Sequence, residues 1–472
     1  MTRAFPSDFL FGVATAAYQI EGAAFEDGRT ASIWDAFSRV PGAVLNADNG
    51  DVACDHYHRY RDDVALMKDL GLQVYRFSTS WSRVRPDGGA VNPAGIDFYS
   101  RLVDELLEAD IMPWLTLHHW DMPQALEEKG GWTSRDTVDR FVEYALSVHD
   151  ALGDRVQHWT TLNEPWCSSF LSYTAGAHAP GRYSVGDGML AAHHLLLSHG
   201  SAVQALRERD PELSQGITLN LTVADPANPA DPADVDAARR IDGQFNRWFL
   251  DPIFRGSYPA DVVEDFRAVD ADAVARWEAA VRPGDLEIIS TPLDAIGVNY
   301  YHGEMLSGHT QGTGGTPHDG GDLERPVGNP FPSHEGIHWV ERGLPRTGMD
   351  WEVQPDGLTR LLVRVAEEYA PGIPVYVTEN GAAYDDVVGD DGVVHDAERL
   401  DFLRAHLAAS LDAVDQGVDL RGYFYWSLMD NYEWSWGYGK RFGIVRVDYD
   451  TLERAVKDSG AEYARIIAAR EL

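Results

Sequence analysis

The stretch Pro374-Val375-Tyr376-Val377-Thr378-Glu379-Asn380-Gly381 begins as an apolar, β-branched run and ends in a carboxylate, an amide and a glycine. Such a run is typical of a buried strand. An ionised glutamate inside a strand would cost several kcal/mol of desolvation, so Glu379 is expected where the strand emerges. The stretch His158-Trp159-Thr160-Thr161-Leu162-Asn163-Glu164-Pro165 has the same form. Because enzymes built on parallel strands hold their chemistry at strand ends, we predict that Glu164 and Glu379 are a catalytic pair.

The rest of the chain alternates between strand-like and helical patterns, which predicts parallel strands with right-handed crossovers. The other strand-like runs are Leu10–Ala16, Gln73–Ser78, Ile111–His119, Gly216–Leu221, Asp294–Tyr301 and Gly422–Ser427. Helical spacing is found in Asp62–Leu70, Ile96–Leu107, Thr137–Leu152, Met189–Leu206, Val235–Phe249, Gly357–Tyr369, Arg399–Gln416 and Glu453–Ala468.

Eight strand–helix units can close into a (β/α)8 TIM barrel, so the predicted fold class is α/β. We expect residues 1–472 to form a single catalytic domain with long βα loops. A doubly wound sheet is the alternative, but the sequence has no Gly-x-Gly-x-x-Gly after a strand and no phosphate-binding loop.

The composition of the chain indicates which kinds of partner it can bind. The chain of 472 residues has 39 Lys and Arg against 75 Asp and Glu, a net charge of −36. This charge repels nucleic acid and anionic membranes, and no run of about 18 apolar residues is present, so neither kind of partner is expected. Two cysteines exclude a disulfide scaffold and favour a cytoplasmic location. None of these features indicates an oligomeric state.

Polar residues near the strand ends would converge on one face of such a barrel. They are Gln19, Arg76, His119, Asn163, Glu164, Asn299, Tyr301, Glu379, Trp426 and Glu433. Amides and carboxylates bind hydroxyl groups, and aromatic faces stack on the C–H side of a sugar ring, so this set indicates a carbohydrate site. Two carboxylates about 5–5.5 Å apart would retain the anomeric configuration, and about 6.5–9.5 Å would invert it. Both outcomes stay open from the sequence.

Other chemistries are less well supported by the residues. The adjacent pairs His118-His119 and His193-His194 lack the spacing of a metal site, and no His-Glu-x-x-His is present, so no metal and no cofactor is expected. Cys167, close to Glu164, is interpreted as a small core residue. The Gly- and Pro-rich stretch 303–348 is either a loop at the mouth of the site or surface, and 225–236 is interpreted as an inert connector.

Several long motifs in sequence order resemble the β-glucosidases of glycoside hydrolase family 1. They are Phe5-Pro6-x-x-Phe9-x-Phe11-Gly12-x-Ala14-Thr15-Ala16-Ala17-Tyr18-Gln19-x-Glu21-Gly22, His119-Trp120-Asp121-Met122-Pro123-Gln124, Thr161-Leu162-Asn163-Glu164-Pro165, Val377-Thr378-Glu379-Asn380-Gly381 and Asn431-Tyr432-Glu433-Trp434. The resemblance runs from Phe5 to the C-terminal helix. It implies a retaining β-glucosidase that acts on nonreducing-end β-D-glucosyl residues of cello-oligosaccharides and other small β-glucosides, with β-galactosides and β-fucosides as further substrates.

The resemblance also implies roles for individual residues. Glu164 matches the general acid/base and Glu379 the nucleophile, supported by Arg76, Tyr301 and Asn299. Residues that match sugar-binding positions are Gln19, His119, Trp120, Asn163, Tyr301, Trp426, Glu433 and Trp434. Two alternatives stay open: a 6-phospho-β-glucosidase, against which the charge of Glu433 argues, and a noncatalytic sugar-binding barrel.

Overall fold

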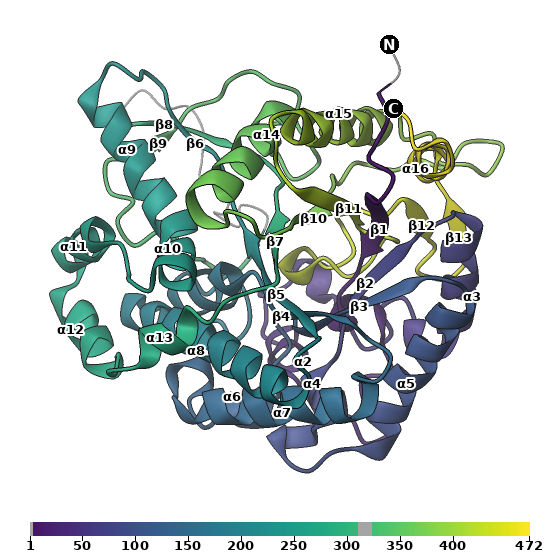
Figure 1. Cartoon of the computed structure of the whole chain (residues 1–472), viewed down its shortest axis with the longest axis horizontal. Coiled ribbons are helices and arrows are strands. Elements are labelled where there is room, and N and C mark those ends of the chain that lie inside the picture. Colours follow the sequence, from purple (N-terminus) through teal and green to yellow (C-terminus); the bar gives the residue numbers. More distant parts are fainter. Residues whose placement is uncertain (1–2, 310–322) are drawn as a thin grey trace.

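The computed structural model describes residues 3–309 and 323–472. Its centre is a closed barrel of parallel strands in the order β1-β11-β10-β7-β5-β4-β3-β2, surrounded by helices (Figure 1). The barrel strands are β1 (Leu10–Ala14), β2 (Val74–Ser78), β3 (Met112–His118), β4 (His158–Asn163), β5 (Ser214–Asn220), β7 (Ala295–Asn299), β10 (Val375–Asn380) and β11 (Leu420–Trp426). The predicted (β/α)8 barrel is therefore confirmed, and each predicted strand run contains or overlaps one of these eight strands.

Helices fill the connections between the strands. They are α1 (Ala17–Ile20), α2 (Ile33–Phe37), α3 (His56–Asp69), α4 (Trp81–Val84), α5 (Pro93–Glu108), α6 (Gln124–Glu127), α7 (Asp136–Leu152), α8 (Val185–Arg209), α9 (Pro232–Asp242), α10 (Trp248–Arg255), α11 (Ala260–Val269), α12 (Ala271–Ala280), α13 (Asp285–Ile289), α14 (Pro355–Arg364), α15 (Ala397–Asp415) and α16 (Asp458–Ala469). π-Helical segments span Cys167–Thr174, Gly243–Arg247 and Val365–Tyr369. The first described residues lie beside the C-terminal ones, joined by an antiparallel bridge between Ala4 and Glu471 (Figure 1).

Large side chains fill the barrel interior toward the N-terminal ends of the strands. Trp114 of β3 contacts Tyr376 of β10 and Phe424 of β11, with ring centroids 4.8 and 5.3 Å apart. Because β3 is not a neighbour of β10 or β11 in the sheet, these rings meet across the barrel. Together with Val74 and Ala295 they form a cluster separate from the main core, and they close one end of the barrel.

One prediction about the outer segments is wrong in part. The predicted helix Glu453–Ala468 begins only at Asp458, because Arg454–Val456 is a short strand, β13, paired with β12 (Val445–Val447). The guanidinium of Arg454 donates to Asp63 of α3 and to the carbonyl of Cys54, which precedes α3. These bonds hold β13 against α3.

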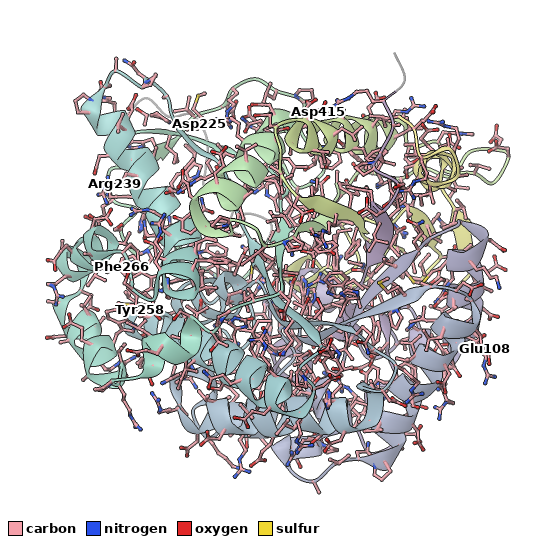
Figure 2. The ribbon with its side chains drawn as sticks, in the orientation of Figure 1. Glu108, Asp225, Arg239, Tyr258, Phe266 and Asp415 are labelled. Atoms are coloured by element: carbon pink, nitrogen blue, oxygen red, sulfur yellow. The ribbon has the colours of Figure 1, made fainter. Side chains whose placement is uncertain are left out.

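The segments interpreted as loop or connector also contain structure. β6 (Ala224–Pro226), β8 (Glu304–Ser307) and β9 (His338–Trp339) form a small sheet outside the barrel. Asp225 of β6, labelled in Figure 2, accepts two bonds from Arg360 of α14 at 2.8 and 2.9 Å. Asp225 therefore ties the start of the β5–β7 connection to α14, and the interpretation of 225–236 as an inert connector stays a prediction. Within 303–348, residues 310–322 lie outside the described residues.

The β5–β7 connection carries α9 to α13, which extend to one side of the barrel (Figure 1). No prediction covered α11 to α13. Arg239 of α9, labelled in Figure 2, donates to Asp261 and Asp265 of α11 at 2.8 and 2.9 Å and so ties these helices together. Among the described helices, none combines the length and apolar character needed to cross a bilayer.

Candidate active site

Irregular pairing in two strands turns the predicted catalytic residues toward the barrel interior. The register of β10 against β7 shifts between Val377 and Glu379, and the register of β4 against β5 shifts between Thr160 and Asn163. Such a shift inserts a residue and re-aims the side chains that follow. Gly381 then has no room for a side chain, because a Cβ there would lie 1.7 Å from the Trp426 carbonyl oxygen.

A chain of short polar contacts joins the two glutamates. Arg76 donates from Nη1 to Glu379 Oε1 at 2.6 Å and from Nη2 to Asn163 Oδ1 at 2.7 Å. Asn299 Nδ2 donates to Asn163 Oδ1 at 3.1 Å and to Glu164 Oε1 at 2.6 Å. Tyr301 donates its hydroxyl to Glu379 Oε2 at 2.7 Å. The surroundings are unequal: the cation and the phenol face Glu379, whereas an amide faces Glu164.

His119, Gln19 and Glu433 extend this network. Asn163 Nδ2 lies 3.0 Å from His119 Nε2, which makes that nitrogen the acceptor and places the imidazole proton on Nδ1. Gln19 Nε2 donates to Asn431 Oδ1 at 3.0 Å, to the Tyr432 carbonyl at 2.8 Å and to Glu433 Oε2 at 3.4 Å. Gln19 Oε1 and His119 Nδ1 are buried without a partner among the described residues. A buried acceptor and a buried donor left unpaired are sites for a ligand's hydroxyl groups.

Tryptophan rings form one side of the site. Trp120 and Trp434 have ring centroids 4.5 Å apart, and Trp426 stacks with His119 at 5.6 Å. Trp120 donates its indole N–H to the Asn163 carbonyl at 3.0 Å, so this donor is already used within the protein. These rings offer flat apolar faces beside a dense set of polar groups, the combination that a sugar ring requires.

The network opens into a cavity of about 980 Å³, including its open mouth. Nine of the twelve predicted site residues line it: His119, Trp120, Glu164, Asn299, Tyr301, Glu379, Trp426, Glu433 and Trp434. The other three, Gln19, Arg76 and Asn163, bond to residues that do line it. The structure thus brings all twelve together.

Three buried carboxyl groups share this space. Burial and then the charge of Glu379 raise the pKa of Glu164 to about 8. Burial, with the charges of Glu379 and Glu164, raises the pKa of Glu433 to about 8. Burial also raises the pKa of Glu379, but the charge of Arg76 and then the Tyr301 hydroxyl act against it. The site therefore favours a proton on Glu164 and a charge on Glu379.

Comparison with known proteins agrees with this geometry. Residues 1–472 match the family described as Glycosyl hydrolase family 1. The chain belongs to glycosyl hydrolase family 1. It superposes on the psychrophilic β-glucosidase BglU of Micrococcus antarcticus with a TM-score of 0.94 and 54% identity, covering 99% of this chain and 98% of that one.

Curated relatives of this family 1 chain span nearly its whole length. It is 44% identical over 468 residues to β-glucosidase A of Thermotoga maritima, covering 98% of each chain. It is 46% identical over 483 residues to the bifunctional β-D-glucosidase/β-D-fucosidase of Bifidobacterium breve, covering 99% of each chain. The family resemblance stated from the motifs is thus confirmed.

The family 1 site holds three non-glycine residues in the left-handed backbone region: Trp120, Glu164 and Trp434, with φ of 76°, 48° and 49°. This region is sparsely populated for such residues, and strain of this kind persists where the surrounding structure fixes it. At all three positions the backbone places a side chain at the cavity wall.

Sequence reasoning missed part of this family 1 cavity. Cys167 is buried, as expected, but it also lines the cavity, and its Sγ lies 3.2 Å from Glu164 Oε2. Asn220, Phe245, Met349 and Trp351 also line the cavity. Asn220 ends β5, Phe245 lies in the connection that follows, and Met349 and Trp351 lie in the β7–β10 connection, so no shared motif links them. The three-residue spacing between Glu164 and Cys167 was the one available signal.

Proposed function

We propose that this chain is a retaining exo-β-glucosidase that hydrolyses β-D-glucosides by double displacement. The proposal depends on one observation above all: two buried glutamates, Glu164 just after β4 and Glu379 in β10, share one network. Among the described residues a cation bonds to Glu379 and none bonds to Glu164. The names of the relatives, β-glucosidases in three cases, support the same activity.

In the first step a carboxylate oxygen of Glu379 attacks the anomeric carbon. The bond to the leaving oxygen breaks, and Glu164 gives that oxygen its proton. In the second step Glu164 takes a proton from water, the water oxygen bonds to the anomeric carbon, and Glu379 leaves as a carboxylate. Two inversions at one carbon give net retention.

Sugar hydroxyl groups would be held by the groups that lack a protein partner. Gln19 Oε1 can accept from a hydroxyl, and His119 Nδ1 can donate to one. Glu433 adds a carboxyl group, and Trp426 offers a ring face. Because the inner end of the barrel is closed by Trp114, Tyr376 and Phe424, the cavity has room for a chain terminus and favours exo action. Glu433 also disfavours a phosphorylated glucoside, since a phosphate there would meet an acidic group, with a pKa of about 8, in place of a cation.

The proposed function is tested by following the hydrolysis of nitrophenyl β-D-glucoside and cellobiose with proton NMR. We expect the β-anomer of glucose to form first and the α-anomer to appear only by mutarotation. An α-anomer formed first would contradict the double displacement, and binding without turnover would support a noncatalytic sugar-binding barrel.

Free cysteine thiols, both buried, support a cytoplasmic location.

The pH profile should report the proton on Glu164. Because that proton must be present for the first step, kcat/KM for an unactivated glucoside should fall as the pH rises through about 8, the pKa of Glu164. Glu433 titrates in the same range. The Glu433→Gln variant separates the two, since it should lose affinity but keep the alkaline limb. Disappearance of the limb in that variant would assign it to Glu433.

Arg76 should determine the acidic limb of the same profile. In Arg76→Met the buried Glu379 loses its cation, so the pKa of Glu379 rises. We expect the acidic limb of kcat/KM to move up by about 1–3 pH units and kcat to fall about 100-fold. Steady-state rates between pH 4 and 9 give both numbers.

A matched control is available for the loss of a buried ion pair. Arg83→Met breaks the buried pair with Glu21, in which Arg83 Nε lies 3.0 Å from the carboxylate, without touching Glu379. This variant should be destabilised to a similar degree, by about 3–5 kcal/mol, with the acidic limb unmoved. Equal limb shifts in both variants would show that unfolding, not the charge on Glu379, causes the effect.

A further inference from the structure

The two oxygens of Glu164 have different partners. Oε1 accepts from Asn299 Nδ2 at 2.6 Å. The orientation of the Asn299 amide is fixed from both ends: Nδ2 also donates to Asn163 Oδ1, an oxygen that accepts from Arg76, and Oδ1 accepts from the Thr378 hydroxyl at 2.8 Å. An oxygen that faces an amide N–H2 at this distance cannot carry a proton toward it. The exchangeable proton of Glu164 therefore belongs on Oε2.

Oε2 is the oxygen that faces Cys167. The Sγ atom lies 3.2 Å from Oε2, and both residues line the cavity. Burial and then the charge of Glu164 raise the pKa of the Cys167 thiol well above its usual range, so the sulfur keeps its hydrogen. Asn220 Nδ2 lies 3.6 Å from Sγ and donates to it from the far side. The sulfur thus receives one bond and has its own S–H left for Oε2.

We propose that Cys167 is a positioning residue of the hydrolysis: its thiol donates to Oε2 of Glu164 and holds the oxygen that first gives and later takes the proton. This inference rests on the proposed function. The bond is strongest when Glu164 is ionised, in the glycosyl-enzyme, because hydrogen bonds to charged groups exceed those between neutral groups. The second step should therefore depend on the thiol more than the first.

A thiol suits this task because it is a weak donor. A strong donor would hold Oε2 equally well but would lower its basicity and so weaken its attack on the proton of water. The other charged or titratable groups around Glu164 are Glu379, Arg76, Tyr301, Glu433 and His119, and none of them bonds to Oε2 among the described contacts. Cys167 is the protein's contact with that oxygen in the described residues.

The test uses three variants of the whole enzyme. Cys167→Ala and Cys167→Val remove the donor and change the side-chain volume in opposite directions, whereas Cys167→Ser replaces the thiol with a stronger donor. With a dinitrophenyl β-glucoside, for which the second step limits kcat, we expect a loss of about 3- to 10-fold in the Ala and Val variants. The Ser variant should lose less, because it keeps a donor to Oε2 but lowers the basicity of that oxygen. The alkaline limb of kcat/KM on an unactivated glucoside should move up in Ala and Val, and down in Ser.

A purely structural role would give a different pattern. Ala and Val would then differ from each other through volume, and the alkaline limb would stay in place in all three variants, which would overturn the inference. The other cysteine supplies the control: Cys54 donates to the Asp430 carbonyl at 3.1 Å, and Cys54→Ser should leave the limb unmoved. If the wild type hydrolyses no β-glucoside, the proposed function fails; if it does and the Cys167 variants leave the limb in place, only this inference fails.

Discussion

The Glu379→Ala variant should lose hydrolysis of nitrophenyl β-glucoside almost completely, with kcat about 10⁵-fold below the wild type. Loss of a covalent nucleophile has effects of this order, because no neighbouring group can take over the attack. Arg76 and Tyr301 would then face an empty space that a small anion can occupy. With added azide and an activated β-glucosyl donor, we expect α-glucosyl azide, the product of a single inversion, identified by NMR.

The control for the loss of a carboxylate is another largely buried glutamate that forms ion pairs. Glu462 of α16 accepts from Arg404 and Arg465 at 2.9 and 2.8 Å, away from the cavity. Glu462→Ala should keep activity close to the wild type. Mass spectrometry adds a direct reading: a 2-fluoro-glucoside should leave one covalent sugar on the wild type and none on Glu379→Ala. Labelling of the variant at another residue would remove Glu379 as the nucleophile.

The barrel and most of the polar cluster could be predicted because they follow from local pattern. Each barrel strand is a short apolar run with polar residues at its end, and parallel strands bring those ends to one face. Glu164 and Glu379 could be singled out because an ionisable group beside an apolar strand avoids the cost of desolvation only where the strand emerges from the core. Arg76 is the exception among the polar residues, since it stands inside β2, and the family resemblance was needed to assign it to Glu379.

What could not be predicted depends on contacts between distant segments or on backbone detail. The register shifts before Asn163 and Glu379 leave no mark in the sequence, although they aim both side chains. Cys167 is a small apolar residue like many in a core, and only the backbone turn after Glu164 shows that its sulfur faces Oε2. The sequence predicts helix at Arg454–Val456, because the pairing of this strand with Val445–Val447 is a tertiary contact that leaves no local pattern.

The Glu164→Ala variant should lose activity in proportion to how much the leaving group needs a proton. For an alkyl β-glucoside or cellobiose we expect kcat/KM to fall about 10³- to 10⁴-fold. For a dinitrophenyl β-glucoside, whose leaving group departs as a stable anion, kcat/KM should change little. The second step lacks its base in either case, so kcat on the activated substrate should fall and the glycosyl-enzyme should accumulate as an initial burst.

Azide discriminates this role from any other loss of function. An anion that needs no general base can enter the space of the missing carboxylate, so added azide should raise kcat on the activated substrate and give β-glucosyl azide, the retained product. Glu379→Ala should give α-glucosyl azide and Glu164→Ala β-glucosyl azide, so each variant is a control for the other. An unfolded protein would produce neither glucosyl azide. Equal losses on both kinds of substrate, without rescue, would mean that Glu164 positions the sugar and that another group moves the proton. The contacts argue against that outcome, because Asn299 occupies Glu164 Oε1 and leaves Oε2, the oxygen beside Cys167, to carry the proton.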